Sequence, residues 1–115
     1  MLPVTTVDVT IADTQTTSTQ INLEGRTIEA IVIPASFEGT AMTFQAALPS
    51  ARGGDAALSW INVVDATGAA YTITVASSTY IILDRYALSG CRHLRLVAGT
   101  AQTGTATVTV VLGND

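Results

Sequence analysis

Apolar and polar residues alternate along much of this chain with the period of two that is typical of β-strands. The clearest example is residues 7–11, in which Val, Val and Ile are separated by Asp and Thr. Side chains two residues apart in a strand point to the same face of a sheet, so this pattern predicts a strand with one buried face. The next predicted strand is Thr27–Ile33, which ends at Pro34 because proline has no N–H group for a strand ladder.

Further segments show the same period or a short apolar run. They lie at residues 21–23, 42–48, 58–64, 71–75, 79–83, 94–96 and 105–112. Residues 65–68 read Asp-Ala-Thr-Gly and predict a tight hairpin between two of these strands. Residues 49–55 collect Pro, Gly and Asp and predict an exposed loop, whereas residues 84–90 could hold one helical turn.

The sequence therefore predicts an all-β fold, namely a single jelly-roll-like β-sandwich of about eight or nine short antiparallel strands. No stretch shows the apolar spacing of a long amphipathic helix. Residues 1–115 form one domain in this interpretation, because the composition does not change along the chain and no repeat divides it. Residues 1–6 are expected to form an extended N-terminal arm that could add a strand to a neighbour's sheet edge.

The composition indicates that much of the surface is covered by other protein. Only 12% of the residues are charged, against about a quarter in ordinary soluble domains, and 48% are hydrophobic. All the basic side chains are arginines, and the chain has no lysine, the residue that most often protects exposed strand edges from pairing with other chains. We therefore expect a subunit of a larger assembly.

Charge, cysteine count and apolar run length exclude several classes of function. The net charge of −4 would repel a nucleic-acid backbone, so no nucleic-acid partner is expected. Cys91 is the one cysteine, which excludes a disulfide within the chain. The longest apolar runs, residues 30–35 and 80–83, are far shorter than the ~18 residues of a membrane helix, so they suit buried strands and no membrane partner is expected. Residues 1–6 do not resemble a secretory signal, so we expect synthesis in a cytoplasm.

The residues best suited to catalysis are Cys91 and His93, which lie two apart on one predicted strand together with Arg95. A thiol beside a base can act as a nucleophile, but it also needs an orienting group and an oxyanion site. Since Leu94 and Leu96 define the core face, His93 and Arg95 are expected to point outward as interface residues. One His and one Cys cannot fill a metal site, and the carboxylates are scattered singly. We therefore predict no enzyme activity, no cofactor and no metal.

Carbohydrate binding is an alternative function, because aromatic rings offer apolar faces on which a sugar can stack. Phe44 and Trp60 alternate in phase with apolar neighbours, so both are expected in the core. Tyr86 lies in the connection 84–90 and is the ring expected to be exposed. It could contact a sugar or anchor a protein interface.

Three segments resemble small structural proteins of tailed bacteriophages. Residues 33–46 read IPASFEGTAMTFQA, residues 80–83 read YIIL, and residues 92–100 read RHLRLVAGT. The similarity spans about residues 20–112 and consists mainly of β-sandwich patterning. Proteins with these features are head decoration (cement) proteins or related virion components.

The resemblance implies a homo-oligomer, most often a trimer, that sits on the capsid exterior and is made in the cytoplasm of a host bacterium. Such a protein bridges subunits of the major capsid protein and stabilises the head. A phage tail or fibre component is an alternative with the same kind of oligomer. The candidate interface residues are Val4, Thr5, Thr6, Arg52, Tyr86, His93 and Arg95.

Overall fold

The computed structural model describes residues 5–23, 26–47, 60–83, 88 and 92–113. These residues form nine β-strands and no helix, which confirms the all-β prediction. The strands are β1 (Thr5–Ile11), β2 (Ile21–Asn22), β3 (Thr27–Ile33), β4 (Ala41–Ala47), β5 (Ile61–Asn62), β6 (Ile73–Thr74), β7 (Thr79–Ile82), β8 (His93–Ala98) and β9 (Ala106–Gly113).

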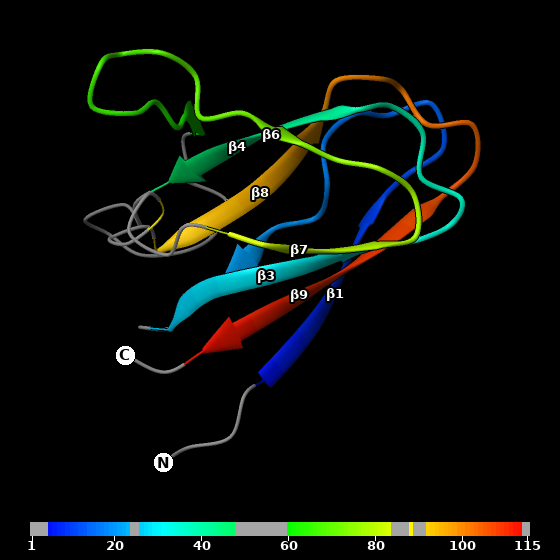
Figure 1. Cartoon of the computed structure of the whole chain (residues 1–115), viewed down its shortest axis with the longest axis horizontal. Helices are drawn as coiled ribbons and strands as arrows, with labels where there is room; N and C mark the ends of the chain where they lie inside the picture. Colours follow the sequence, from blue (N-terminus) through cyan, green and yellow to red (C-terminus); the bar gives the residue numbers. More distant parts are fainter. Residues whose placement is uncertain (1–4, 24–25, 48–59, 84–87, 89–91, 114–115) are drawn as a thin grey trace.

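The strands pair antiparallel in two sheets that pack face to face (Figure 1). Sheet A has the order β1-β9-β3-β7, and sheet B has the order β2-β8-β4-β5, with β6 also paired to β4. The pairing is nested, because β1 pairs with β9, β2 with β8, β3 with β7, and β4 with both β5 and β6. This is the pattern of a long hairpin folded over into two layers, so the β-sandwich is jelly-roll-like.

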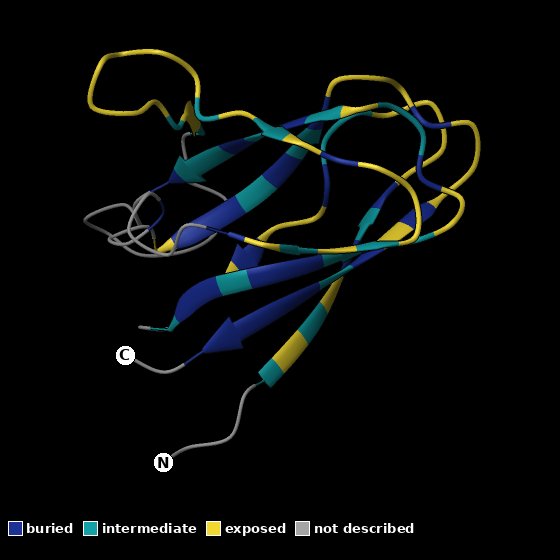
Figure 2. Cartoon of the chain, in the orientation of Figure 1, coloured by how far each residue is buried: buried dark blue, intermediate teal, exposed yellow. Residues whose placement is uncertain are grey.

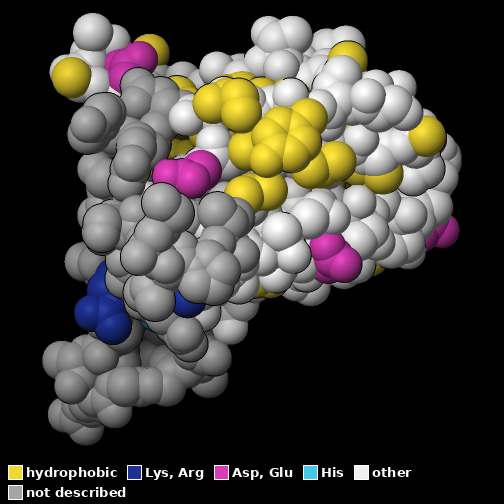
Figure 3. Space-filling view, turned by 60° about the horizontal axis from the view of Figure 1, so that its bottom comes forward, with side chains coloured by type: hydrophobic (Ala, Val, Ile, Leu, Met, Phe, Trp, Pro, Cys, Tyr) yellow, Lys and Arg dark blue, Asp and Glu magenta, His cyan; other side chains and the backbone are white. Residues whose placement is uncertain are grey.

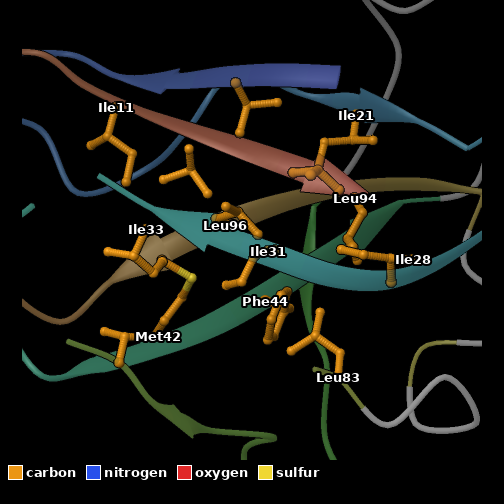
Figure 4. Close-up of a cluster of buried hydrophobic side chains, with 14 of the residues drawn as sticks. Ile11, Ile21, Ile28, Ile31, Ile33, Met42, Phe44, Leu83, Leu94 and Leu96 are labelled. Carbon is orange, nitrogen blue, oxygen red and sulfur yellow. The ribbon is translucent and has the colours of Figure 1, made fainter. Parts of the chain in front are cut away.

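Alternation along the long strands builds the core between the two sheets. In β9, Val108 and Val110 are buried and alternate with the more exposed Thr107 and Thr109. Figure 2 shows that β3 and β9, the inner strands of sheet A, are buried along most of their length. In Figure 4 the side chains of both sheets meet in this core, among them Ile11, Ile31, Ile33, Met42, Phe44, Leu94 and Leu96. Their removal from water is the main favourable term in folding.

The long strands match the predictions closely, and β3 covers Thr27–Ile33 as expected. The strands predicted at 58–64 and 71–75 are shorter and form only β5 and β6. The hairpin at 65–68 is confirmed, since the Gly68 N–H donates to the Asp65 carbonyl oxygen at 3.0 Å and Gly68 has a φ of 87°. The predicted loop at 49–55 and the predicted helical turn at 84–90 lie outside the described residues, apart from the buried Leu88.

One end of the sandwich is held together by Gln102, a polar residue that is only 1% exposed. Its Nε2 donates to the carbonyl oxygens of Glu38 (2.9 Å) and Thr100 (3.0 Å), and its Oε1 accepts from the Glu38 N–H (2.9 Å). Its backbone N–H donates to the Gln15 carbonyl oxygen at 3.1 Å, and its carbonyl oxygen accepts from the Thr14 N–H at 2.7 Å. Gln102 thereby links its own loop to two loops that are distant in sequence.

Candidate functional site

The outer face of sheet A carries almost no charge. Because side chains alternate along each strand, those that do not enter the core form rows across this face. One row runs Thr6, Val111, Ala30 and Ile82, and the next row runs Asp8, Thr109, Val32 and Tyr80. Across the four strands of sheet A the charged residues are Asp8 and Glu29, with neither Lys nor Arg. A surface with so few charged side chains does little to disfavour contact with other proteins.

The apolar residues of these rows lie in β7 and in the next two strands of the sheet, β3 and β9. We call them the β7 patch. Its members are Ala30, Val32, Tyr80, Ile82 and Val111. Two of these side chains are strongly exposed, with 61% of Tyr80 and 75% of Ile82 accessible. Figure 3 shows hydrophobic side chains gathered on this side of the molecule, with acidic side chains nearby. Ala30 and Val111 are buried beside them, with 2% and 8% accessible, so the exposed apolar surface of the patch comes from Tyr80, Ile82 and the half-buried Val32.

The outer face of sheet B carries a different arrangement, built around the one tryptophan of the chain. The strand register places Asn62 of β5, Gln45 of β4 and Arg95 of β8 in one row. Arg95 Nε donates to Gln45 Oε1 at 2.7 Å, and Gln45 Nε2 donates to Asn62 Oδ1 at 2.9 Å. The Arg95 guanidinium lies over the Trp60 ring, 4.5 Å from the ring centroid. We call these four residues the Trp60 cluster.

The chemistry of the Trp60 cluster suits a polar ligand with an apolar face. Burial lowers the pKa of Arg95 below its usual value, but a guanidinium stays charged at neutral pH. A cation over an aromatic ring contributes about 0.5–1 kcal/mol at exposed sites, so the contact orients both side chains. Gln45 and Asn62 add amide donors and acceptors beside the ring, which are the groups that bind sugar hydroxyls.

His93 lies on the outer side of sheet B, but the expectation that it points outward into an exposed position is wrong. It pairs with Ala47 of β4 and with Asn22 of β2, and only 6% of it is accessible. Its Nδ1 atom is buried and has no hydrogen-bond partner among the described residues. Alternation with Leu94 and Leu96 predicts the side of the sheet on which His93 lies, but it does not predict how much of the side chain is accessible. His93 is therefore unsuited to direct contact with a partner.

Of the other predicted interface residues, the structure describes Thr5, Thr6 and Arg95, which lie in different sheets. Thr5 and Thr6 belong to β1 and pair with β9, so they are part of the sandwich and not of a separate arm. Arg95 lies on the outer face of sheet B, half-buried in the Trp60 cluster. Val4, Arg52, Tyr86 and Cys91 lie outside the described residues.

Two apolar segments are more exposed than their sequence predicts. Trp60, expected in the core, is half-buried beneath Arg95, because the strand around it is too short for alternation over 58–64 to fix its face. The run 80–83, expected to be buried, alternates instead. Ile81 packs against the core, whereas Tyr80 and Ile82 are exposed. Among the described strands β7 pairs only with β3, which is a property of the topology that leaves no local signal in the sequence.

Neither a metal centre nor a spanning helix is found in the part of the chain that the structure describes. No three His, Cys, Asp or Glu side chains there are placed to share a metal ion. That part of the chain also has no helix with the length and apolar character needed to cross a membrane. Among the described residues, the β7 patch and the Trp60 cluster are the surface features on which a functional proposal can be built.

Comparison with known proteins assigns no family to this chain. No protein-family model matches it. A search of the curated proteins finds no match either. The geometry of the two outer faces is therefore the basis for a functional assignment.

Proposed function

We propose that this chain is a non-enzymatic structural protein of a tailed-phage virion that decorates the head. In this role it binds copies of itself and bridges neighbouring subunits of the major capsid protein on the capsid exterior. The observation that supports the proposal is the outer face of sheet A, where threonine and apolar side chains replace the charges of an ordinary surface. The resemblance of residues 33–46, 80–83 and 92–100 to decoration proteins points to the same class.

The composition of this face suits a surface that is covered in an assembly. The centres of protein interfaces are depleted of charge and enriched in aromatic residues. The β7 patch combines the exposed ring of Tyr80 with aliphatic neighbours and contains no charged residue. The threonines beside it present a methyl group and a hydroxyl group, so covering them buries no charge.

A decoration protein of this kind stabilises the head by mass action. Its binding sites lie between neighbouring capsid protein subunits, so they exist in the assembled shell and not in dispersed subunits. Binding then favours the shell by RT ln(1 + [L]/Kd), which is about 2.7 kcal/mol per site when the free protein is at a hundredfold excess over Kd. The jelly-roll-like pairing supports the proposal by analogy, since such folds occur in viral capsid domains and also in lectins.

Mixing the purified chain with expanded heads that lack it, followed by sedimentation, tests the proposal. We expect the chain to sediment with the heads in a fixed ratio to the capsid protein. We also expect it to raise the temperature at which the heads release their DNA. Sedimentation with isolated tails instead would identify a tail or fibre component. Binding to neither particle would refute a virion role.

The Trp60 cluster supports a second candidate function, carbohydrate binding. A sugar ring could stack on the indole of Trp60 while its hydroxyl groups bond to Gln45 and Asn62. This candidate uses the outer face of sheet B and needs neither a capsid nor an oligomer. The two candidate functions therefore use different faces of the molecule and can be tested separately.

Intrinsic fluorescence tests the carbohydrate candidate directly, because Trp60 is the only tryptophan of the chain. Titration with soluble bacterial surface oligosaccharides should change its emission and reach saturation if the cluster binds sugars. Asn62→Ala should then weaken binding, whereas Thr107→Ala in sheet A should not. Emission that stays constant up to the solubility limit of the oligosaccharides would exclude this function.

A further inference from the structure

The strands at the edges of the two sheets differ in how well they are protected from pairing with another chain. In sheet B, the edge strands β2 and β5 have two residues each, which offers little to pair with. In sheet A, β1 carries the charged Asp8 and is covered at its end. There the Thr19 N–H donates to the Thr10 carbonyl oxygen at 3.0 Å, and Ser18 bridges to Ile11.

β7 is the other edge of sheet A, and within the described residues it has none of these protections. Its sequence, TYII, contains neither a charge nor a proline. The Leu83 N–H, just after β7, donates to the Glu29 carbonyl oxygen of β3 at 2.9 Å. Successive residues of an antiparallel strand direct their backbone groups alternately toward the neighbour and away from it. The backbone groups of Tyr80 and Ile82 therefore point to the open side.

The register of sheet A gives the same direction independently. Thr10 accepts its hydrogen bond on the open side of β1, so every second residue of β1, counted from Thr10, points away from β9. The residues of β9 whose backbone groups point away from β1 pair with Ala30 and Val32 of β3. The alternate residues of β3, Ile31 and Ile33, therefore direct their backbone groups toward β7. Tyr80 and Ile82 again face outward.

This open edge is complementary to itself. If two copies meet antiparallel about a two-fold axis at Ile81, Tyr80 of each copy lies opposite Ile82 of the other. Both residues direct N–H and C=O groups outward, so each pair can exchange both of its backbone hydrogen bonds. The Tyr80 ring then lies beside the Ile82 side chain of the second copy, a cross-strand pair of the kind that stabilises sheets.

The distribution of charge favours a second copy as the occupant of this edge. With a net charge of −4, two copies repel each other on average. The β7 patch avoids this repulsion because it contains no charged residue. Asp8 lies on the opposite edge of sheet A, and Glu29 lies next to Leu83, at one end of β7. In an antiparallel pair the two Glu29 residues would therefore lie at opposite ends of the contact.

We propose that β7 is a self-association edge through which two copies of this chain pair antiparallel, with Tyr80 opposite Ile82, about a two-fold axis. The two sheets A then form one continuous sheet, and the two β7 patches adjoin. The inference rests on the self-association in the proposed function and not on the capsid. It requires an even number of copies, so any trimers would be joined in pairs.

Amide hydrogen exchange of the full chain across a dilution series tests this pairing. Where sedimentation shows an oligomer, we expect slow exchange at the amides of Tyr80 and Ile82, and fast exchange after dilution to the monomer. A native mass measurement should give an even number of copies. Tyr80→Lys and Ile82→Lys place a charge on the exposed edge and should abolish the oligomer at these concentrations. Thr107→Lys, exposed on the same face but in β9, should leave it intact.

Several outcomes would overturn the pairing. One is a native mass that shows only odd numbers of copies. The others are fast exchange of both amides in the oligomer and an oligomer that persists in both lysine variants. If a lysine variant does not fold, exchange in the unsubstituted chain still decides. Protection of both amides only after heads are added would show that capsid protein occupies the edge instead. A pair that binds no heads would refute the capsid role alone, and a monomer that binds heads would refute the pairing alone.

Discussion

At the scale of single residues, two glycines at positive φ allow the effect of backbone strain on stability to be separated from the effect of crowding by neighbouring atoms. Gly39 has a φ of +104°, and a Cβ added there would lie 2.9 Å from Thr100 Oγ1 and 3.0 Å from Thr100 Cβ. Gly68 has a φ of +87°, and no atom lies within 4 Å of an added Cβ. Both positions disfavour a side chain, but only Gly39 is also crowded.

We expect Gly68→Ala to lower the free energy of unfolding by about 1 kcal/mol, because an L-residue is strained at positive φ. Gly39→Ala should lower it by about 2–4 kcal/mol, since its methyl group must also displace Thr100. Urea unfolding of the two variants and the unsubstituted chain measures both effects. Equal losses in the two variants would show that Thr100 moves aside freely.

Gln102 is the second residue-scale feature with a measurable effect. Gln102→Leu would remove the partner of the part-buried N–H and C=O groups of Glu38 and of the Thr100 carbonyl. An unpaired buried group costs about 1–3 kcal/mol, and water can reach these groups in part, so we expect a total loss of about 1–3 kcal/mol. Gln15→Leu is the matched control, because the Gln15 side chain is exposed and the change there should stay within about 0.5 kcal/mol. Thermal unfolding of both variants makes the comparison.

Asp65 supplies a dependence on pH within the hairpin at 65–68. Its Oδ1 accepts hydrogen bonds from the Thr67 hydroxyl (2.6 Å), the Thr67 N–H (2.8 Å) and the Ala69 N–H (3.2 Å). These bonds, the one from the Thr67 hydroxyl most of all, lower the pKa of Asp65 below its usual value of 3.8. Because the folded-state pKa is the lower one, this contribution to stability is present above pH 3.8 and is lost as the pH falls through the lowered pKa.

NMR titration of the Asp65 carboxyl group checks this prediction. We expect Thr67→Val to move the pKa of Asp65 part of the way back to its usual value, because it removes the largest cause of the shift. Asp65→Asn should remove the pH dependence of the Thr67 amide signal. A titration curve that is the same with and without the Thr67 hydroxyl would contradict this account.

At the scale of elements, the side chains of the Trp60 cluster link β8, β4 and the start of β5 in addition to the backbone pairing of these strands. Arg95→Ala should cost about 0.5–1 kcal/mol through the lost contact with the ring and should shift the emission of Trp60. Arg92→Ala is the control, since it removes the same charge from an exposed position one residue before β8. If both variants change the emission equally, the stacking of Arg95 on Trp60 has no separate effect.

The elements that could be predicted from the sequence are those whose own alternation fixes a face. Residues 7–11 and the first part of 105–112 alternate over enough positions to set their strand assignment, whereas Thr27–Ile33 was recognised as a mainly apolar run that ends at Pro34. β5 and β6 were predicted too long, because their two residues are held by pairing with β4 and not by a pattern of their own. Trp60 was assigned to the wrong face for the same reason.

The candidate sites were harder to predict than the strands. His93 pairs with residues of β2 and β4 and is only 6% exposed, whereas Tyr80 and Ile82 are exposed on β7, which pairs only with β3 among the described strands. These properties depend on which strands become neighbours in the folded sheet. Arg95 was correctly expected on the outer side, but its partners Gln45 and Trp60 come from other strands. Strand order, which the local sequence does not encode, decides all of these outcomes.

At the scale of the whole molecule, net charge opposes contact between copies. The chain has a charge of −4 at pH 7 and a pI near 4.6. We therefore expect self-association to strengthen as the pH is lowered from 7 toward the pI, and to strengthen with added salt at pH 7, because both reduce repulsion. Sedimentation velocity at several pH values measures this trend. Ile82→Lys should stay monomeric throughout, and an oligomer in that variant would place the contact elsewhere.

The nested pairing of the strands has a consequence for how the chain folds during synthesis. β9 is synthesised after the eight other described strands, yet it lies between β1 and β3 in the middle of sheet A. Until β9 is available, β1 has no ladder partner in that sheet and β3 has only β7. Pairings between distant parts of a chain form slowly, and unpaired strands expose apolar surface meanwhile. We therefore expect the nascent sandwich to be most prone to aggregate just before β9 emerges.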